Sequence, residues 1–272
     1  MLTLGWFSTG RDKAARDLLA IVMDAIQRGE LDARIQLVFS NREPGEAHDS
    51  DLFFQQVHGY GIPLVTLSSQ RFRRERGGGP LQAHRLEYHR EVRALLDDYR
   101  PDLYVLAGYM LIVDAEMCRR YAMINLHPAA PGGPAGTWQE VIWKLIEEDA
   151  RQTGVKMHLV TEELDLGATA TYCTFPIRGE SFDPLWKEAQ GRSVAQLQAT
   201  YGEEMPLFRL IRQHGVAREL PLILATLKAL AEGRVAIKEG AVVDAQGRPV
   251  EGHCLTEEMD REVARLGLPS AW

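Results

Sequence analysis

Short apolar runs alternate with longer amphipathic segments along the first half of the chain. The predicted strands cover residues 2–7, 34–39, 62–67 and 102–107. The predicted helices cover residues 13–28, 52–57, 84–99 and 114–121. Strands that alternate with helices are typical of a parallel α/β sheet. We therefore expect an open, mostly parallel twisted sheet with helices on both faces.

The composition is that of an ordinary globular protein, with 45% hydrophobic and 25% charged residues. The formal net charge of −7 argues against a nucleic acid or an anionic membrane surface as partner. The chain starts with an apolar run that has no basic lead, so we expect no secretion signal, no membrane anchor and a cytoplasmic location. Cys118, Cys173 and Cys254 are widely separated and odd in number. They fit reduced thiols rather than a disulfide framework or a zinc site, and we expect no metal.

Two apolar runs, each predicted to form a buried strand, lead into polar residues of a catalytic type. Residues 121–124 precede Asn125, His127 and Pro128, and residues 155–160 precede Asp165. An amide can donate to an oxyanion, an imidazole can transfer a proton, and a carboxylate can orient the imidazole or a water. The alternative is that Asn125 and His127 have a structural role only, because an Asn and a His beside a Pro often form the turn at a strand end. His158 and Asp165 would flank the carboxyl end of the run 155–160, which favours the catalytic interpretation.

These two segments, together with residues 105–113, resemble the folate-dependent formyltransferases, and most closely the phosphoribosylglycinamide formyltransferase branch of that family. The similarity extends in order and spacing over residues 2–179. It implies the formyltransferase fold, 10-formyltetrahydrofolate as co-substrate, and Asn125, His127 and Asp165 as catalytic residues. It also implies that the loop after the strand at 102–107 and the loop of Asp165 hold the pterin. The expected cofactor-binding residues are Tyr109, Met110, Leu111, Ile112, Val113, Val160, Glu162 and Leu164.

The reaction implied by the resemblance is direct attack of a neutral primary amine on the formyl carbon. His127 would donate to the oxyanion or relay the proton of the amine, and Asn125 would donate to the oxyanion. Asp165 would orient His127 and a bound water. A carboxylate in that place is expected to raise the pKa of the imidazole.

The loop after the first strand departs from the relatives, which have a glycine-rich turn there that holds the substrate phosphate. This chain keeps one glycine in that loop and adds two cations, which we expect to bind an anion together with the helix N-terminus. An equally supported alternative is that Asp12 caps the helix while Arg11 and Lys13 are solvated. Further along, the family's acidic ribose-contacting residue is missing, and Glu219 is expected to replace it. The expected substrate-binding residues are Thr9, Gly10, Arg11, Asp12, Lys13 and Glu219.

A smaller departure from the family affects the Asp165 loop on the expected folate side, and a basic segment of the chain has two interpretations. Leu166 precedes Gly167 where relatives have two glycines, so the Asp165 loop is expected to differ in shape if positive φ is needed there. The basic run 71–76 and the glycines at 77–79 are predicted to form solvated loops. The alternative for the basic run is that it attracts a phosphorylated or polyglutamate-bearing ligand.

The predicted domain organisation is a formyltransferase domain at 1–235, with an insertion at about 180–206, followed by an extension at 236–272. Residues 207–234 are expected to form a helix. The C-terminal extension is expected to contain a hairpin at 242–250, turned at Gln246 and Gly247, and a helix at 256–266. No catalytic role is expected for the extension.

The leading functional hypothesis is formylation of glycinamide ribonucleotide in purine biosynthesis, with a phosphorylated small-molecule amine as substrate. The alternatives are formylation of another amine such as an amino sugar, and hydrolysis of 10-formyltetrahydrofolate. The altered loop at 9–13 supports these alternatives, although the known hydrolase arrangement includes an N-terminal regulatory domain that is not expected here. A non-catalytic folate or nucleotide binder is disfavoured by the presence of Asn125, His127 and Asp165. A homodimer is left open.

Overall fold

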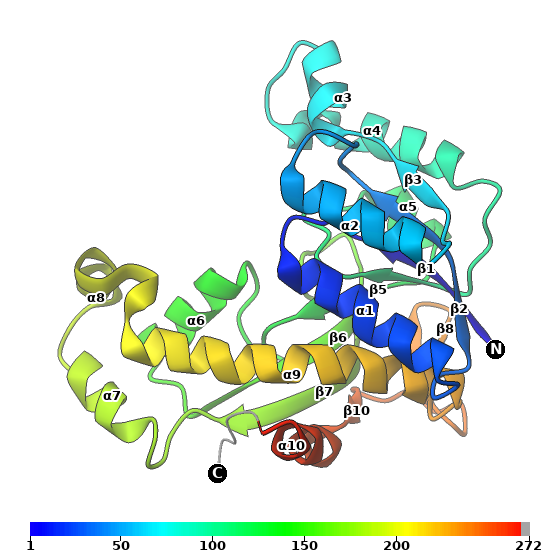
Figure 1. The fold of residues 1–272 in the computed structure, drawn as a ribbon. Helices are drawn as coiled ribbons and strands as arrows, with labels where there is room; N and C mark the ends of the chain where they lie inside the picture. Colours follow the sequence, from blue (N-terminus) through cyan, green and yellow to red (C-terminus); the bar gives the residue numbers. More distant parts are fainter. Residues whose placement is uncertain (268–272) are drawn as a thin grey trace.

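The computed structural model describes residues 1–267 and contains one large twisted sheet (Figure 1). The order of its eight strands is β10-β7-β6-β5-β4-β1-β2-β3. The strands are β1 (Leu2–Phe7), β2 (Ala33–Ser40), β3 (Leu64–Thr66), β4 (Leu103–Leu106), β5 (Met123–His127), β6 (Gln152–Leu159), β7 (Thr169–Pro176) and β10 (His253–Cys254). All neighbouring strands are parallel except that β6 is antiparallel to both β5 and β7. The prediction of an open, mostly parallel sheet is confirmed.

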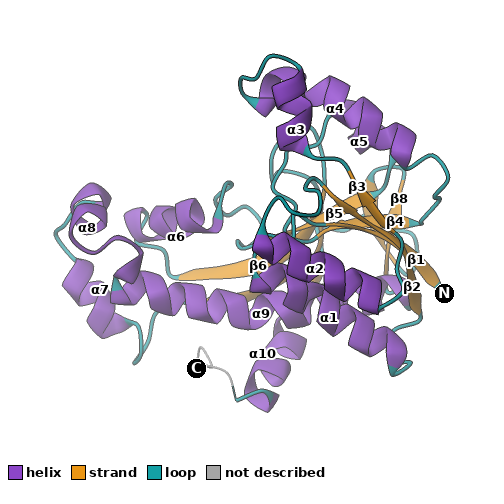
Figure 2. Ribbon diagram, turned by 45° about the horizontal axis from the view of Figure 1, so that its top comes forward, coloured by secondary structure: helices purple, strands orange, loops and turns teal. Residues whose placement is uncertain are grey.

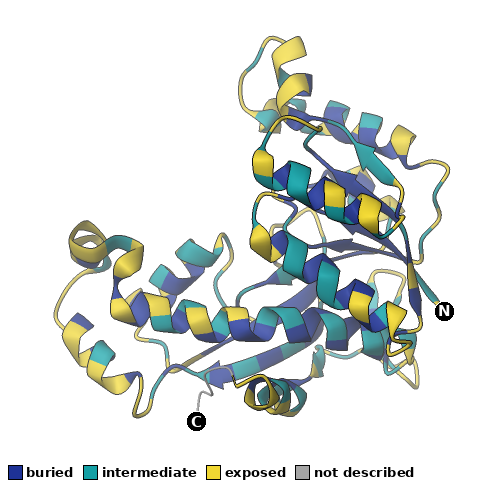
Figure 3. Ribbon diagram, in the orientation of Figure 1, coloured by how far each residue is buried: buried dark blue, intermediate teal, exposed yellow. Residues whose placement is uncertain are grey.

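Helices cover both faces of the sheet, as Figure 2 shows. On one face lie α1 (Lys13–Gln27), α2 (His48–Gly59) and α9 (Pro206–Ala231), and on the other lie α3 (Ser69–Glu75), α4 (Leu81–Leu95) and α5 (Ala115–Arg120). Successive residues of β1 illustrate why two layers are needed. Trp6 is buried in the cluster with α1 and α2, whereas Phe7 is buried in the cluster with α4 and α5. The central strands are therefore buried on both sides (Figure 3).

A third apolar cluster lies around the N-terminal half of α9. It contains α6 (Trp138–Glu147) and the predicted insertion, which forms α7 (Asp183–Ala189), α8 (Val194–Tyr201) and the short helix η1 (Gly202–Glu204). In Figure 1 these helices gather beside the end of α9 that is remote from β10. Trp186 of the insertion is buried and donates to Ile177 O at 2.6 Å, so it belongs to this local core. Tyr201 is 43% exposed.

The C-terminal segment returns to the main sheet. A hairpin of β8 (Val235–Lys238) and β9 (Ala241–Asp244) is followed by a turn at Gln246 and Gly247, after which Val243 bridges Pro249. The edge strand β10 then pairs with β7, and α10 (Thr256–Arg265) packs on α9 and β7. The predicted C-terminal hairpin and helix are confirmed, although an additional hairpin precedes the predicted one. The predicted boundary between the domain and the extension at residue 235 stays a prediction. Val242, Leu255 and Met259, which follow this boundary, pack in the main core.

Several predicted elements differ from the observed ones. The basic run 71–76 is largely the helix α3 and not a loop, because Ser68 caps it by accepting from Arg71 N and Phe72 is buried. The helix predicted at 84–99 begins at Leu81 and ends at Leu95, well before Pro101. The strand predicted at 121–124 begins at Met123 and includes Asn125 and His127. None of the helices in residues 1–267 is both long enough and apolar enough to span a membrane.

Candidate active site

Four polar side chains share one face of the sheet on β5 and β6. Asn125 is the register partner of His158, and His127 is the register partner of Lys156. Residues directly opposite each other in an antiparallel pair point to the same face. The alternate residues of β6, Val155, Met157 and Leu159, are buried in the apolar core of the opposite face. The strand alternation thus separates a polar block, defined here as Asn125, His127, His158 and Lys156, from the core.

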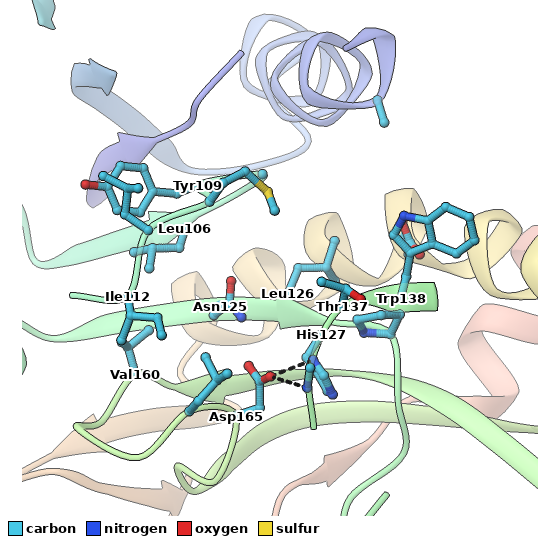
Figure 4. Close-up of a pocket in the computed structure, with 18 of the residues that line it drawn as sticks. Leu106, Tyr109, Ile112, Asn125, Leu126, His127, Thr137, Trp138, Val160 and Asp165 are labelled. Atoms are coloured by element: carbon cyan, nitrogen blue, oxygen red, sulfur yellow. Dashed lines mark hydrogen bonds and ion pairs between the residues drawn. The ribbon is translucent and has the colours of Figure 1, made fainter. Parts of the chain in front are cut away.

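Asp165 reaches this polar block on a loop that folds back from the end of β6. Its Oδ2 lies 3.4 Å from His127 Nδ1 and accepts a hydrogen bond from Gly136 N at 3.1 Å (Figure 4). Its Oδ1 lies 3.5 Å from His158 Nε2. The structure therefore brings Asn125, His127 and Asp165 together. Because β6 is antiparallel to β5, the carboxyl end of β6 lies beside the start of β5, and the loop of Asp165 has to fold back to reach His127.

The shape of the Asp165 loop depends on two backbone features. Asp165 itself adopts φ of 59°, and Leu166, where relatives have a glycine, does not have positive φ. Gly167 approaches Leu159 so closely that a Cβ would lie 1.8 Å from Leu159 O. The glycine that the loop retains is thus required for a close approach and not for positive φ.

Hydrogen bonds assign the protons of the two histidines. His127 Nε2 lies 2.8 Å from Pro134 O, and since a carbonyl only accepts, Nε2 carries the proton. In the neutral ring, Nδ1 is then the free acceptor that faces Asp165. By the same reasoning His158 donates from Nδ1 to Leu159 O at 2.9 Å. Its Nε2 accepts from Asn125 Nδ2 at 3.3 Å.

Burial dominates the electrostatics of His127. It lowers the pKa of the imidazole below its ordinary value, and the contributions of Pro134 O and Asp165 in the opposite direction do not reverse the shift. Asp165 contributes in the expected direction, but the net pKa shift of His127 is downward because desolvation outweighs the nearby carboxylate. For Asp165, burial opposes ionisation, yet the contacts with His158, His127 and Gly136 N lower the carboxyl pKa. At neutral pH the site therefore holds a neutral imidazole beside a carboxylate.

A cavity of about 800 Å³ opens over Asn125, His127 and Asp165. Of the expected cofactor-binding residues, seven line this cavity: Tyr109, Met110, Leu111, Ile112, Val113, Val160 and Leu164. Glu162 does not line it and instead pairs with Arg119 at 3.0 Å. A buried threonine fixes the loop that follows β4, since Thr9 Oγ1 accepts from Met110 N at 3.0 Å and donates to Asn41 Oδ1 at 2.7 Å.

The expected substrate-binding residues separate into two groups. Arg11, Asp12 and Glu219 line the cavity. Thr9, Gly10 and Lys13 do not: Thr9 bonds to Asn41, Gly10 lies against Phe53, and Lys13 pairs with Asp17. Asp12 caps α1 by accepting from Ala15 N at 3.0 Å, as the structural alternative proposed, and Arg11 Nε lies 3.3 Å from its carboxylate. A carboxylate therefore occupies the helix N-terminus that was expected to attract an anion.

Other cavity residues were not found from the sequence. Arg212 pairs with Glu219 at 2.5 Å, and its guanidinium lies 4.5 Å from the ring centroid of Trp138. Glu203 of η1 and Glu140 of α6 also line the cavity. These side chains come from helices that meet only in the folded chain, so no local spacing signals them. No group of side chains suited to a metal ion is found among residues 1–267.

The profile of the formyl transferase family matches residues 13–181, more than half of the 272 residues. The chain belongs to the formyl transferase family. The phosphoribosylglycinamide formyltransferase of Escherichia coli (strain K12) is 26% identical over 244 residues, which cover 88% of this chain and 94% of the relative. That of Dictyostelium discoideum is 27% identical over 192 residues, which cover 65% of this chain and 89% of the relative. The resemblance inferred from the catalytic segments is confirmed.

Solved structures of a formyltransferase and of a deformylase share the fold. A phosphoribosylglycinamide formyltransferase from Coxiella burnetii superposes with a TM-score of 0.65 and 21% identity, covering 93% of this chain and 98% of that chain. A formyltetrahydrofolate deformylase from Pseudomonas syringae pv. tomato superposes with a TM-score of 0.61 and 21% identity, covering 89% of this chain and 65% of that chain. At these identities the likeness establishes the fold and does not distinguish a transferase from a hydrolase.

Proposed function

We propose that this formyl transferase moves the formyl group of 10-formyltetrahydrofolate to a primary amine, with glycinamide ribonucleotide as the leading acceptor in purine biosynthesis. The observation that carries the proposal is the contact of Asp165 with His127 beside Asn125 in a large cavity. The names of the relatives from E. coli and D. discoideum support glycinamide ribonucleotide as the acceptor.

The residues of the cavity suit a folate. Leu106, Ile112, Val113, Val160 and Leu164 supply an apolar wall, and a volume of about 800 Å³ is within the usual range of ligand sites. The backbone between Gly108 and Val113 adds polar groups, in a loop that the Thr9 hydroxyl holds through Met110 N. These residues would hold the pterin, and the formyl group would lie on N10, which a methylene group joins to the pterin.

In the proposed mechanism His127 acts as a general base. Its Nδ1 accepts a proton from the amine as the new carbon–nitrogen bond forms, and the imidazolium so produced faces the Asp165 carboxylate. Asn125 Nδ2 has a second hydrogen beyond the one directed to His158, and it donates this hydrogen to the developing oxyanion. A preorganised donor of this kind lowers a barrier by about 3–4 kcal/mol. The proton then leaves with the tetrahydrofolate nitrogen as the original carbon–nitrogen bond breaks.

A second candidate is formyl transfer to an amine without a phosphate, such as an amino sugar. It is favoured by the charges on the cavity wall, where Arg11 and Arg212 are already paired with Asp12 and Glu219. Glu140 and Glu203 add further negative charge to the cavity wall. A substrate phosphate would have to replace carboxylates at Arg11 or Arg212.

The deciding experiment follows the absorbance of 10-formyltetrahydrofolate with purified protein under three conditions: glycinamide ribonucleotide, an amino sugar, and no amine. Turnover that requires glycinamide ribonucleotide supports the leading proposal. Turnover that requires the amino sugar selects the second candidate, and equal turnover without any amine selects hydrolysis and overturns amine transfer. A cytoplasmic location and a homodimer stay predictions, which cell fractionation and analytical ultracentrifugation test.

A further inference from the structure

Lys156 is a buried lysine within the polar block. It is 5% exposed, and its register partner on β5 is His127. On its other side it is paired with Tyr172 of β7. Burial of an ammonium group costs free energy unless a partner compensates for the lost water. The buried ammonium group of Lys156 therefore needs a hydrogen-bond or ion-pair partner.

That partner is the backbone of Asp165. Lys156 Nζ donates to Asp165 O at 2.9 Å. Asp165 has φ of 59°, a conformation that is uncommon for a residue with a Cβ and persists only where its surroundings hold it. The carboxylate of the same residue contacts His127 and His158. Three of the four residues of the polar block thus contact one residue of the loop, each through a different atom of Asp165.

We propose that Lys156 is a positioning residue of the transfer reaction: its ammonium group holds the Asp165 peptide in the left-handed conformation that directs the carboxylate toward His127. An ammonium is a strong, charge-assisted donor to a carbonyl. The Asp165 carboxylate balances its charge within the same buried site. Lys156 does not line the cavity, so it acts through Asp165 and not on the substrate.

The first test replaces the ammonium by an apolar group of similar length, in the variant Lys156→Met of the full chain. The kcat of formyl transfer is expected to fall by about tenfold to a hundredfold, because Asp165 is displaced from its productive geometry. The KM for 10-formyltetrahydrofolate is expected to change by roughly twofold at most, since the cavity wall is retained. The matched control is Lys144→Met, because Lys144 is an exposed lysine of α6 that pairs with Glu147 and lies outside the cavity. Its kcat is expected to stay unchanged.

A double-mutant cycle separates positioning from general support of the fold. If Lys156 acts through the Asp165 carboxylate, Lys156→Met costs little further rate in an Asp165→Asn background, and the two effects are non-additive. A lysine that only stabilises the sheet lowers kcat by the same factor in both backgrounds. Equal factors overturn the proposal.

The kinetic tests rest on the proposed function, so a second readout is independent of turnover. Gly136 N donates to Asp165 Oδ2, and its amide hydrogen exchange therefore reports where the carboxylate lies. We expect exchange at Gly136 to accelerate in Lys156→Met and not in Lys144→Met. If Lys156→Met does not fold, Lys156→Gln is measured with the same expectation, because it lacks the charge and length of the lysine. Unchanged exchange at Gly136 in the folded variant overturns the proposal, whether or not the wild-type protein transfers formyl groups.

Discussion

His127 presents Nδ1 to Asp165 because its other nitrogen donates to Pro134 O. The carbonyl selects the tautomer and burial keeps the ring neutral, and in the proposed mechanism the carboxylate stabilises the imidazolium. Each role therefore comes from a different neighbour of one imidazole. Removal of one neighbour should affect one property of the ring and leave the others.

The variants His127→Ala and Asp165→Asn are both expected to lower kcat of formyl transfer. The loss for His127→Ala should be about a hundredfold or more, since general base catalysis commonly contributes that much. His58→Ala is a suitable control, because His58 is an exposed histidine of α2. Circular dichroism should show an intact fold in all three proteins. Near-normal turnover in either site variant would contradict the assignment of these residues.

The pH dependence of kcat/KM should report the lowered pKa of His127. Activity is expected to rise with pH as the imidazole loses its proton, with the midpoint below the ordinary value of 6.5. In Asp165→Asn the midpoint should move lower still, because Asp165 contributes in the direction that raises this pKa. An acid limb centred above 6.5 in the wild-type protein would exclude His127 as the base.

At the scale of elements, the antiparallel strand β6 is what creates the site. It places Lys156 and His158 beside His127 and Asn125, and it forces the chain to fold back over them before β7 begins. The return loop fits only because Gly167 lies against the carbonyl of Leu159. The proposed catalytic geometry therefore depends on Gly167, although Gly167 does not line the cavity.

The variant Gly167→Ala tests this dependence. A Cβ at this position would lie 1.8 Å from Leu159 O, so the loop must move and carry Asp165 away from His127. We expect a large loss of kcat and a loss of unfolding free energy of about 1–3 kcal/mol, as for other overpacked sites. The matched control is Gly59→Ala, where no atom lies within 4 Å of the added Cβ. Retention of full activity in Gly167→Ala would show that the loop tolerates a different shape.

At the scale of the whole molecule, the C-terminal segment is attached to the main core by an ion pair. Arg218 of α9 is fully buried and lies 3.0 Å from Asp260 of α10, while its guanidinium covers the ring of Phe175. Removal of the carboxylate leaves a buried guanidinium without that partner, which is strongly destabilising. The ion pair should thus bind the last helix to the rest of the protein.

The variants Asp260→Ala and Glu204→Ala compare two carboxylates that each pair with an arginine of α9. Asp260→Ala should lower the free energy of unfolding by about 3 kcal/mol, measured in urea. Glu204→Ala should change it by about 0.5 kcal/mol or less, because Glu204 and Arg209 are both largely exposed. Equal effects would show that α10 adds little to the stability of the core.

Two buried histidines should make the whole protein sensitive to acid. Burial lowers the pKa of His89 and of His214 from 6.5 to about 4. Between these values the unfolded chain binds protons that the folded chain does not, so stability is full above pH 6.5 and is lost as the pH falls toward 4. Urea unfolding at several pH values should show this decline, and His214→Gln should make it shallower. A stability that is constant from pH 7 to pH 4 would contradict the burial of both rings as neutral groups.

Much of the architecture follows from local patterns. The first helix was predicted to within one residue, because its apolar stripe and the Asp12 cap are both local features. Asn125, His127 and Asp165 were found because each lies near the end of an apolar run. The helix α3 was missed, since its apolar signal is a single buried side chain, Phe72, among arginines.

The sequence by itself determined the sheet-and-helix order and the residue types of the site, because periodicity and motif spacing act over a few neighbouring residues. Only the tertiary structure decided that β6 runs antiparallel, that Lys156 supports Asp165, and that Arg212 and Trp138 meet Glu219. The tertiary structure also decided the direction of the net pKa shift of His127. This direction depends on the competition between burial and a nearby carboxylate, and both terms exist only after distant segments have packed together.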